Sequence, residues 1–317
     1  MNLALGNFLC QITKLGAVDL HVHSTASDGS YTPQEVLALA KRNQLSYLAL
    51  TDHDTIAGSQ ELIKSYPTLE SYLKKNKQDL NSLLAQNKNQ LLDRPVLLIP
   101  GIEFSLIFEN QEIHLLAYYS GLEIEKLNDF MEKQRKARFQ RNRKMIARLR
   151  DLNIPIPLDE LDPTSEQAVT GRVKVAKWLV TNQYVDSIAQ AFSKFLGPGK
   201  KAYVPRKRIE LSQALDIISR SNGFPVIAHP HQYGWTVSEE LLDQKIASIL
   251  KFAPIGIEVY HSDASLAEQK LALAIAEKYS LAYTAGSDFH GVNKEKHHLY
   301  SALHKPENHF GKIKDIS

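Results

Sequence analysis

The stretch Asp19-Leu20-His21-Val22-His23-Ser24 places two imidazoles where an apolar, strand-forming run, Ala17 to Leu20, ends. Three further stretches have the same arrangement: Thr51-Asp52-His53-Asp54, Ala228-His229-Pro230 and Gly286-Ser287-Asp288-Phe289-His290. An apolar strand does not end in unpaired imidazoles or carboxylates without a cost in free energy, because buried polar groups need partners. Together the four stretches indicate a polynuclear metal site, whose nitrogen and oxygen ligands suit Zn, Mn or Fe.

Strand and helix patterns alternate around these stretches. The first strand is followed by a helix from Pro33 to Asn43, with Thr32 as N-cap, and by a second strand from Leu45 to Thr51. This order predicts a parallel sheet. Later apolar runs complete about seven strands, at 96–100, 112–118, 225–228, 255–260 and 282–285, with a hairpin between the third and fourth. We expect an α/β fold, a closed or nearly closed (β/α) barrel with its site at the C-terminal strand ends.

Two segments interrupt this pattern. The polar stretch Glu61 to Leu92 predicts one or two exposed helices. From 123 to 205 strand patterns are absent and helical ones prevail, which predicts a helical insertion. We therefore expect a barrel formed by residues 17–122 and 206–317, carrying the metal site, and a substrate-binding insertion formed by residues 123–205.

Composition narrows the class of protein. The 317 residues are 43% hydrophobic and 23% charged, enough for one large or two ordinary domains, and the net charge of +3 is too small to predict binding of duplex DNA. Cys10 is the single cysteine, so the chain has no intrachain disulfide and no thiolate metal cluster. No window approaches the apolar length of a membrane span. The expectation is a cytoplasmic protein without membrane association.

Each candidate ligand taken alone has an ordinary explanation. Asp28 lies in a Ser/Thr-rich turn, Glu103 could be a surface carboxylate after Pro100-Gly101, and His114 could be a satisfied core histidine. The remaining candidates could belong to turns or surface pairs. Chance does not place nearly all of them at the C-terminal ends of different strands, so we interpret them as one site. The histidines left over are expected on the surface: His261, His297, His298, His304 and His309.

The four stretches resemble the motifs of the polymerase and histidinol phosphatase (PHP) domain of metal-dependent phosphoesterases, over roughly Val18 to Gly291. The chain looks most like the branch with 3′,5′-nucleotide bisphosphatases and the 5′-3′ exoribonuclease RNase AM. The resemblance implies a distorted, TIM-like (β/α)7 barrel with an inserted helical subdomain. The chain differs from this branch in two respects. Its stretch Glu61 to Leu92 is longer than is usual there, and it has Lys174 and Arg206 where relatives often carry histidine.

The same resemblance implies two to three divalent metal ions, of Mn, Fe or Zn, with Glu103 as a bridging ligand. One ion would take His21, His23, Glu103 and Asp288, a second Glu103, His114 and His229, and a third Asp28, His53 and His290.

Basic residues of the insertion suggest substrate contacts. Arg172 resembles an arginine that faces the metals and binds substrate phosphate in relatives, which implies a catalytic role. Lys200 and Lys201 lie in a Gly-Pro-Gly loop that could equally be an exposed turn. A basic run in a predicted amphipathic helix is either a solvated face or a wall that contacts phosphates: Lys133, Arg135, Lys136, Arg138, Arg141, Arg143, Lys144, Arg148 and Arg150. Its predicted apolar residues are Phe139, Met145, Ile146 and Leu149.

We therefore predict a metal-dependent phosphatase or exonuclease acting on nucleotides, such as a 3′,5′-bisphosphate, or on short oligonucleotides. Bound metals lower the pKa of water, so no nucleophilic side chain is needed. His231 is the candidate proton donor to the leaving oxygen, although a surface histidine would look the same. Two alternatives remain: a small-metabolite phosphatase of the histidinol phosphate kind, and a catalytically silent binding module.

Overall fold

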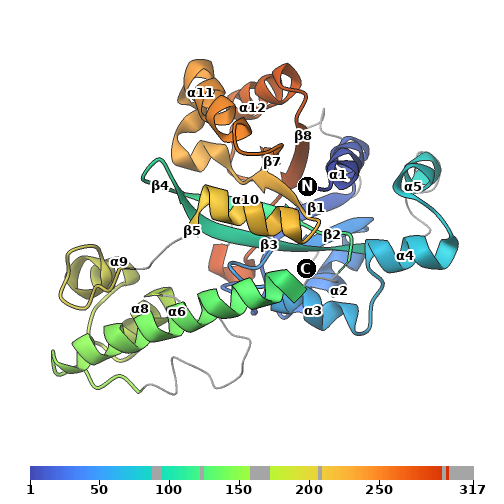
Figure 1. Ribbon diagram of the computed structural model, residues 1–317. Helices are drawn as coiled ribbons and strands as arrows, with labels where there is room; N and C mark the ends of the chain where they lie inside the picture. Colours follow the sequence, from blue (N-terminus) through green and yellow to red (C-terminus); the bar gives the residue numbers. More distant parts are fainter. Residues whose placement is uncertain (88–94, 122–124, 158–171, 206–208, 295–297, 300–317) are drawn as a thin grey trace. The chain divides into compact units, whose positions relative to one another are not determined.

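The computed structural model describes residues 1–87, 95–121, 125–157, 172–205, 209–294 and 298–299 (Figure 1). The chain divides into two compact units, one formed by Met1–Leu127 with Ile209–Ser317 and the other by Asn128–Arg208. Both boundaries fall a few residues later than the predicted limits of the insertion. Arg206 and the tail histidines His297, His304 and His309 lie outside the described residues.

The first unit is built on a barrel-shaped sheet. Its strands follow one another in the order β1 (Val18–Val22), β2 (Tyr47–Leu50), β3 (Leu97–Phe108), β4 (Gln111–Tyr118), β6 (Phe224–Ile227), β7 (Gly256–His261) and β8 (Ala282–Gly286), and β5 (Ile209–Glu210) pairs with β3 off this path. Neighbours are parallel except β4, which is antiparallel to both β3 and β6. The predicted hairpin between the third and fourth strands is thus confirmed.

The sheet nearly closes between its first and last strands. The Asp288 backbone N–H donates to the carbonyl of His21 at 2.8 Å, and the His23 N–H donates to the carbonyl of Phe289 at 2.9 Å. These bonds join the end of β1 to the chain that leaves β8. The predicted α/β fold, a distorted (β/α)7 barrel, is confirmed, and its first and last strand ends lie side by side.

Helices cover the sheet of the first unit: α1 (Leu3–Leu15), α2 (Pro33–Arg42), α3 (Ala57–Ile63), α4 (Leu69–Asn76), α5 (Leu80–Asn87), α10 (Leu211–Arg220), α11 (Glu239–Leu250) and α12 (Leu266–Lys278). Helix α2 begins as predicted, because Thr32 and Glu35 form a reciprocal capping box. The polar stretch after Glu61 was predicted to form one or two exposed helices. Its described part contains two short helices after α3, namely α4 and α5, and most of their side chains are at least partly exposed, but Leu69 and Leu83 are buried in the core.

Two apolar clusters lie on opposite faces of the strands. In β2, Tyr47 and Ala49 pack with Phe8 and other residues of α1, whereas Leu48 and Leu50 pack with α2. This alternation follows from the two-residue period of a strand. Helix α1 therefore belongs to the barrel core, and the Phe8 ring meets the Tyr47 ring edge-on at a centroid distance of 5.5 Å.

An irregularity in β1 determines which face of the sheet carries its two histidines. The register with β2 shifts between Asp19 and Val22, and the packing changes face at the same point. Leu20 packs in the α1 cluster, but Val22, two residues on, packs in the α2 cluster. Because side chains alternate along a strand, His21 and His23 both lie opposite Val22.

Among its described residues, the second unit contains helices joined by turns and loops, and no strand. It contains most of α6 (Glu125–Arg150), together with α8 (Arg172–Thr181), α9 (Ile188–Ala191) and one π-helical turn, Phe192–Leu196. Three of the four apolar residues predicted for α6 are confirmed, since Met145, Ile146 and Leu149 are buried against α8 and the residues that follow it. Phe139 is only half-buried and lies beside Arg143. The exposed side chains of α6 include Lys133, Lys136, Arg143, Lys144, Arg148 and Arg150.

Among the described helices, none combines the length and the apolar composition needed to cross a lipid bilayer.

Candidate metal centre

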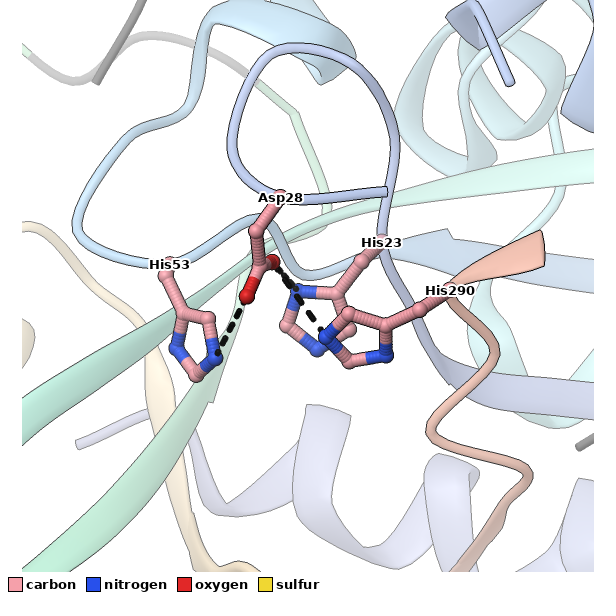
Figure 2. A group of neighbouring side chains, drawn as sticks. All are labelled: His23, Asp28, His53 and His290. Carbon is pink, nitrogen blue, oxygen red and sulfur yellow. Dashed lines mark ion pairs between the residues drawn. The ribbon is translucent and has the colours of Figure 1, made fainter. Parts of the chain in front are cut away.

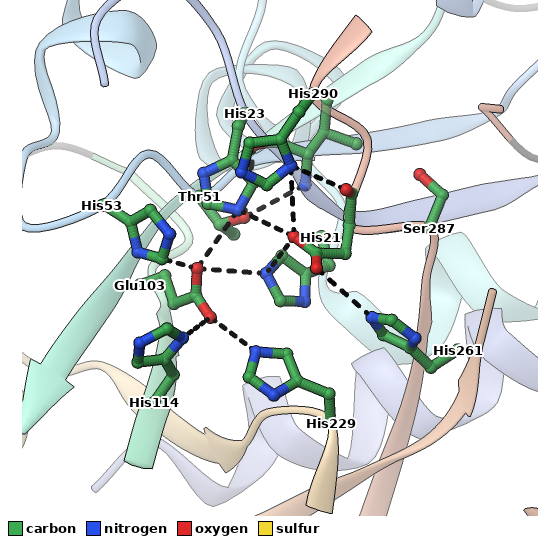
Figure 3. Close-up of polar contacts among 12 residues, drawn as sticks. His21, His23, Thr51, His53, Glu103, His114, His229, His261, Ser287 and His290 are labelled. Carbon is green, nitrogen blue, oxygen red and sulfur yellow. Dashed lines mark hydrogen bonds and ion pairs between the residues drawn. The ribbon is translucent and has the colours of Figure 1, made fainter. Parts of the chain in front are cut away.

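Glu103 is the centre of the site. Its carboxylate is fully buried on β3 and faces imidazoles carried by several different strand ends (Figure 3). Oε2 lies 3.3 Å from His21 Nε2, 3.1 Å from His23 Nε2 and 3.0 Å from His53 Nδ1, and Oε1 lies 2.8 Å from His114 Nδ1 and 3.0 Å from His229 Nε2. One carboxylate thus contacts five imidazoles.

Most of these short contacts are not hydrogen bonds. Five buried atoms of the cluster have no hydrogen-bond partner: Glu103 Oε2, His21 Nε2, His23 Nε2, His53 Nδ1 and His114 Nδ1. Native interiors seldom leave buried polar atoms in this condition, and an unseen ion is one of the ordinary reasons for it. The converging nitrogen and oxygen atoms therefore fit divalent cations of the Zn, Mn or Fe class.

The remaining predicted ligands extend the cluster on two sides. Asp288 Oδ1 lies 3.3 Å from His23 Nε2 and 3.6 Å from His21 Nε2. Figure 2 shows Asp28 between three imidazoles, with its carboxylate oxygens 3.2 Å from His290 Nε2, 3.6 Å from His23 Nδ1 and 3.9 Å from His53 Nε2. All nine residues predicted as ligands thus lie in one cluster.

Three sets within the cluster bring their ligand atoms within 4.8 Å of one another: His21, His23, Glu103 and Asp288; His23, Asp28, His53 and His290; and His53, Glu103 and His114. The first set is the one the family resemblance implied. The second adds His23 to the implied set, and in the third His53 takes the place expected for His229, whose Nε2 nevertheless contacts Glu103. His23 and His53 therefore each lie between two sets.

Charge is divided unevenly over the imidazoles. Burial raises the pKa of Glu103, but His53, His114 and His21 outweigh it and hold this pKa well below its usual value. Burial lowers the pKa of His53 to about 3 and that of His229 to about 4, whereas Asp288 and Glu103 outweigh burial at His23 and raise its pKa to about 9. Two of the imidazoles that contact Glu103 are thus neutral at neutral pH, the state in which an imidazole binds a metal.

The backbone bends sharply at several of these residues. His229 has φ of 26°, Asp288 of 54° and Asp54 of 52°, all in the left-handed region that residues with a side chain rarely adopt. Asp54 is held there by Ser105, whose N–H and hydroxyl donate to its carboxylate at 3.0 and 3.1 Å. Such local strain persists where the surroundings fix it, and it is often found at functional sites.

Asp52, the carboxylate of the Thr-Asp-His-Asp stretch, stabilises the loop after β1. It accepts hydrogen bonds from the Ser24 N–H at 2.8 Å, from the Ser24 hydroxyl at 2.8 Å and from the Ser27 hydroxyl at 2.7 Å. This loop connects His23 to Asp28. Asp52 therefore acts on the cluster by positioning other residues.

Sequence reasoning missed two buried residues of β7. Glu258 was not considered, although its carboxylate lies 3.0 Å from His21 Nδ1. His261 was expected on the surface, and that prediction is wrong: it is 1% exposed, and its Nε2 lies 3.6 Å from Asp288 Oδ2 (Figure 3). A signal was present, because β7 is an apolar strand that ends directly in an imidazole, as β1 does. His298 is exposed, as expected.

The candidate substrate contacts lie in two places. His231 follows His229 in a short 3-10 helix, Pro230–Tyr233; it is partly buried, and burial and His261 lower its pKa. Arg172, in the second unit, lies over the rings of Phe192 and Tyr203 at 5.5 and 5.9 Å. Lys200 and Lys201 are exposed in the same unit.

Comparisons with known proteins agree with this geometry. The 5′-3′ exoribonuclease Rnm of Escherichia coli K12 is 32% identical over 272 residues, which cover 86% of this chain and 84% of that protein. The 3′,5′-nucleoside bisphosphate phosphatase of Chromobacterium violaceum is 28% identical over 274 residues, covering 86% and 87%. The structure of a Bifidobacterium adolescentis protein assigned as a metal-dependent phosphoesterase superposes with a TM-score of 0.67 at 25% identity, covering 92% and 93%. Residues 19–262 match the PHP domain model, and the chain therefore belongs to the PHP domain family.

Proposed function

We propose that this protein is a metal-dependent phosphoesterase that hydrolyses phosphate esters of nucleotides and of short oligonucleotides. The observation that carries the proposal is the Glu103 carboxylate, buried among five imidazoles and short of hydrogen-bond partners. The relatives named as an exoribonuclease and as a nucleoside bisphosphate phosphatase support the substrate class.

Two or three divalent ions would be held by the cluster. His21, His23, Glu103 and Asp288 would hold the first, Glu103, His114 and His229 the second, and Asp28, His53 and His290 the third. When bound, such ions supply a Lewis acid for a phosphoryl oxygen and lower the pKa of a bound water. Glu103 would serve two ions with its two oxygens.

The hydroxyl groups beside the cluster are engaged in positioning. The Ser24 hydroxyl donates to Asp52 at 2.8 Å, the Ser287 hydroxyl donates to Asp19 at 2.6 Å, and the Thr51 hydroxyl donates to the carbonyl of Val22 at 3.3 Å. A serine nucleophile would need a base to remove its proton, whereas two of these hydroxyls donate to carboxylates that hold the backbone. The arrangement favours water as the nucleophile over a covalent intermediate.

His231 is our candidate for the general acid that donates a proton to the leaving oxygen. Its Nε2 is buried without a hydrogen-bond partner, and its ring lies 4.8 Å from that of His261, beside the cluster. None of the ligand sets includes it. An imidazole with an open nitrogen can hold and release one proton.

Arg172, Lys200 and Lys201 are our candidates for binding substrate phosphate, and Arg172 would also stabilise the charge on the nonbridging oxygens of the phosphate that is cleaved. Arg172 is partly exposed, its Nη1 donates to the carbonyl of Leu196 at 3.5 Å, and its guanidinium lies over the Phe192 and Tyr203 rings. A fixed guanidinium can bind two phosphoryl oxygens at once. Because one phosphoryl group does not need all these cations, we expect substrates with two phosphates, or with a phosphate and a nucleotide chain.

The test is a release assay with Mn²⁺ supplied and three substrates: adenosine 3′,5′-bisphosphate, a 5′-phosphorylated short RNA and histidinol phosphate. We expect phosphate or mononucleotide from the first two, at higher kcat/KM than from histidinol phosphate. Equal efficiency on histidinol phosphate would contradict the substrate class. A protein that binds Mn²⁺ but releases nothing from any phosphate ester would instead be a silent binding module.

A further inference from the structure

Glu258 lies where two of the proposed ligands meet, and it is not one of the nine. It is 1% exposed in β7, between the end of β1 and the end of β6. Its Oε1 lies 3.0 Å from Nδ1 of the His21 ring, and its Oε2 accepts a hydrogen bond from the backbone N–H of His229 at 2.8 Å. Each oxygen therefore contacts a different strand end.

The contact with His21 favours one tautomer of that ring in its neutral form. A carboxylate only accepts hydrogen bonds, so a neutral His21 ring, the form that binds a metal, carries its proton on Nδ1, where Glu258 accepts it. The lone pair is then on Nε2, which faces Glu103 at 3.3 Å and Asp288 at 3.6 Å. A carboxylate behind an imidazole in this way fixes the ring and strengthens it as a metal ligand.

The contact with His229 acts on the backbone instead. The N–H that donates to Glu258 belongs to His229, which has φ of 26° and directly precedes Pro230. This hydrogen bond helps to hold a conformation that is costly by itself. The ring of His229 then stacks on that of His21, with centroids 5.6 Å apart and an interplanar angle of 20°, while its Nε2 reaches Glu103 Oε1 at 3.0 Å.

We propose that Glu258 is a positioning residue that ties His21 and His229 together, so that the two metal positions sharing Glu103 are set by one buried carboxylate. The inference rests on the metal site of the proposed function, but not on its substrate. His21 and His229 belong to different ions in that site, and Glu258 is a described residue in contact with both.

The residues His21, Glu258 and His261 could instead form a metal site of their own, since their ligand atoms lie close enough together. The hydrogen bonds disfavour this alternative. Both oxygens of Glu258 already accept from N–H groups, and Nδ1 of His261 accepts from the backbone N–H of Asp263 at 3.0 Å. Glu258 thus acts as a hydrogen-bond acceptor behind the ligands.

The experiment is a titration of the protein with Mn²⁺ after a chelator has removed its metal. Calorimetry measures the affinities, and elemental analysis measures the number of bound ions. Glu258→Gln keeps the size of the side chain but leaves one acceptor oxygen, which can serve His21 or His229 and not both. Loss of such a partner lowers metal affinity by roughly 10- to 100-fold. We expect this loss at two Mn²⁺ positions, with the position formed by Asp28, His53 and His290 unchanged.

Two further variants complete the design. Glu268→Gln is the matched control, because Glu268 caps α12 and bonds Thr236 and Ser265 without touching a proposed ligand, so its Mn²⁺ affinities should equal those of the wild type. Glu258→Asp keeps the charge but shortens the reach by one methylene. It should also weaken two positions, and it replaces Glu258→Gln if that variant does not fold.

The outcomes separate the inference from the proposed function. A folded Glu258 variant with wild-type Mn²⁺ affinities, or with a single weakened position, overturns the tie between His21 and His229. A fourth Mn²⁺ ion that is lost with Glu258 overturns its role as an acceptor. A wild-type protein that binds no Mn²⁺ refutes the proposed function, and this inference with it.

Discussion

Replacing Glu103 with glutamine should remove two metal ions at once. The substitution keeps the size of the side chain but makes one oxygen an amide nitrogen, which donates hydrogen bonds and does not bind metal. Each oxygen of Glu103 faces a different set of imidazoles, at 3.0–3.3 Å for Oε2 and 2.8–3.0 Å for Oε1. Loss of the negative charge of Glu103 should therefore lower the metal affinity of both proposed positions that share this residue.

The magnitude follows from the number of ligands. A four-ligand zinc site is worth about 10–16 kcal/mol, so one ligand contributes roughly 2.5–4 kcal/mol, or two to three powers of ten in affinity. We expect a loss of this size for each of the two ions. The ion held by Asp28, His53 and His290 should remain, because Asp28 contacts these imidazoles without Glu103.

The assay is Mn²⁺ titration by calorimetry, with elemental analysis of the reconstituted protein and circular dichroism to establish that the variant is folded. Glu109→Gln is the matched control, since Glu109 lies at the turn after β3, is exposed and pairs with Lys245. It should bind Mn²⁺ as the wild type does. A folded Glu103→Gln variant that keeps its full metal content, or loses only one ion, refutes the bridging role of Glu103.

Three further changes have separate expected results. Arg172→Lys should lower kcat/KM by roughly one to three powers of ten, about 1.4–4 kcal/mol of transition-state stabilisation. Metal content and melting temperature should not change. Unchanged kinetics would mean that Arg172 only packs against Phe192 and Tyr203. Asp28→Asn should remove one ion by elemental analysis, because Asp28 is the carboxylate of that set alone, and a loss of two ions would argue against separate positions. Phe8→Ala should lower the free energy of unfolding by roughly 3–5 kcal/mol in a urea titration, since Phe8 is 1% exposed in the barrel core, and a loss below 1 kcal/mol would contradict that role.

The strand ends were predictable because their chemistry is local. An apolar run that stops at an imidazole, as Leu20 does before His21, signals a buried strand whose end needs a partner. Local patterns likewise predicted Thr32 as the N-cap of α2 and most of the apolar face of α6. The family resemblance then supplied the grouping of ligands, which spacing alone did not provide.

Other features depend on contacts between distant segments. Glu258 lies inside an apolar strand, where a single sequence cannot distinguish a functional carboxylate from a chance one. The third predicted strand ended at Pro100, but β3 continues through Gly101 to Phe108. A side chain at Gly101 would lie 2.8 Å from Thr51 Cγ2 and 3.0 Å from the carbonyl oxygen of Leu50, so the close approach of β2 explains why glycine fits there.

The histidines of β1 show the same limit. The two-residue spacing of His21 and His23 predicted a shared face correctly. It did not predict the register shift between Asp19 and Val22, which moves Val22 to the α2 cluster. That shift arises from pairing with β2, far along the chain, and no residue of β1 alone signals it.

The most direct test of the metal centre is the number of ions that the wild-type chain holds. Elemental analysis after purification, and again after chelation and reconstitution with Mn²⁺, should give two or three ions per chain, because the nine predicted ligands form overlapping sets around Glu103. A content of no more than one tightly bound ion after reconstitution would contradict the account.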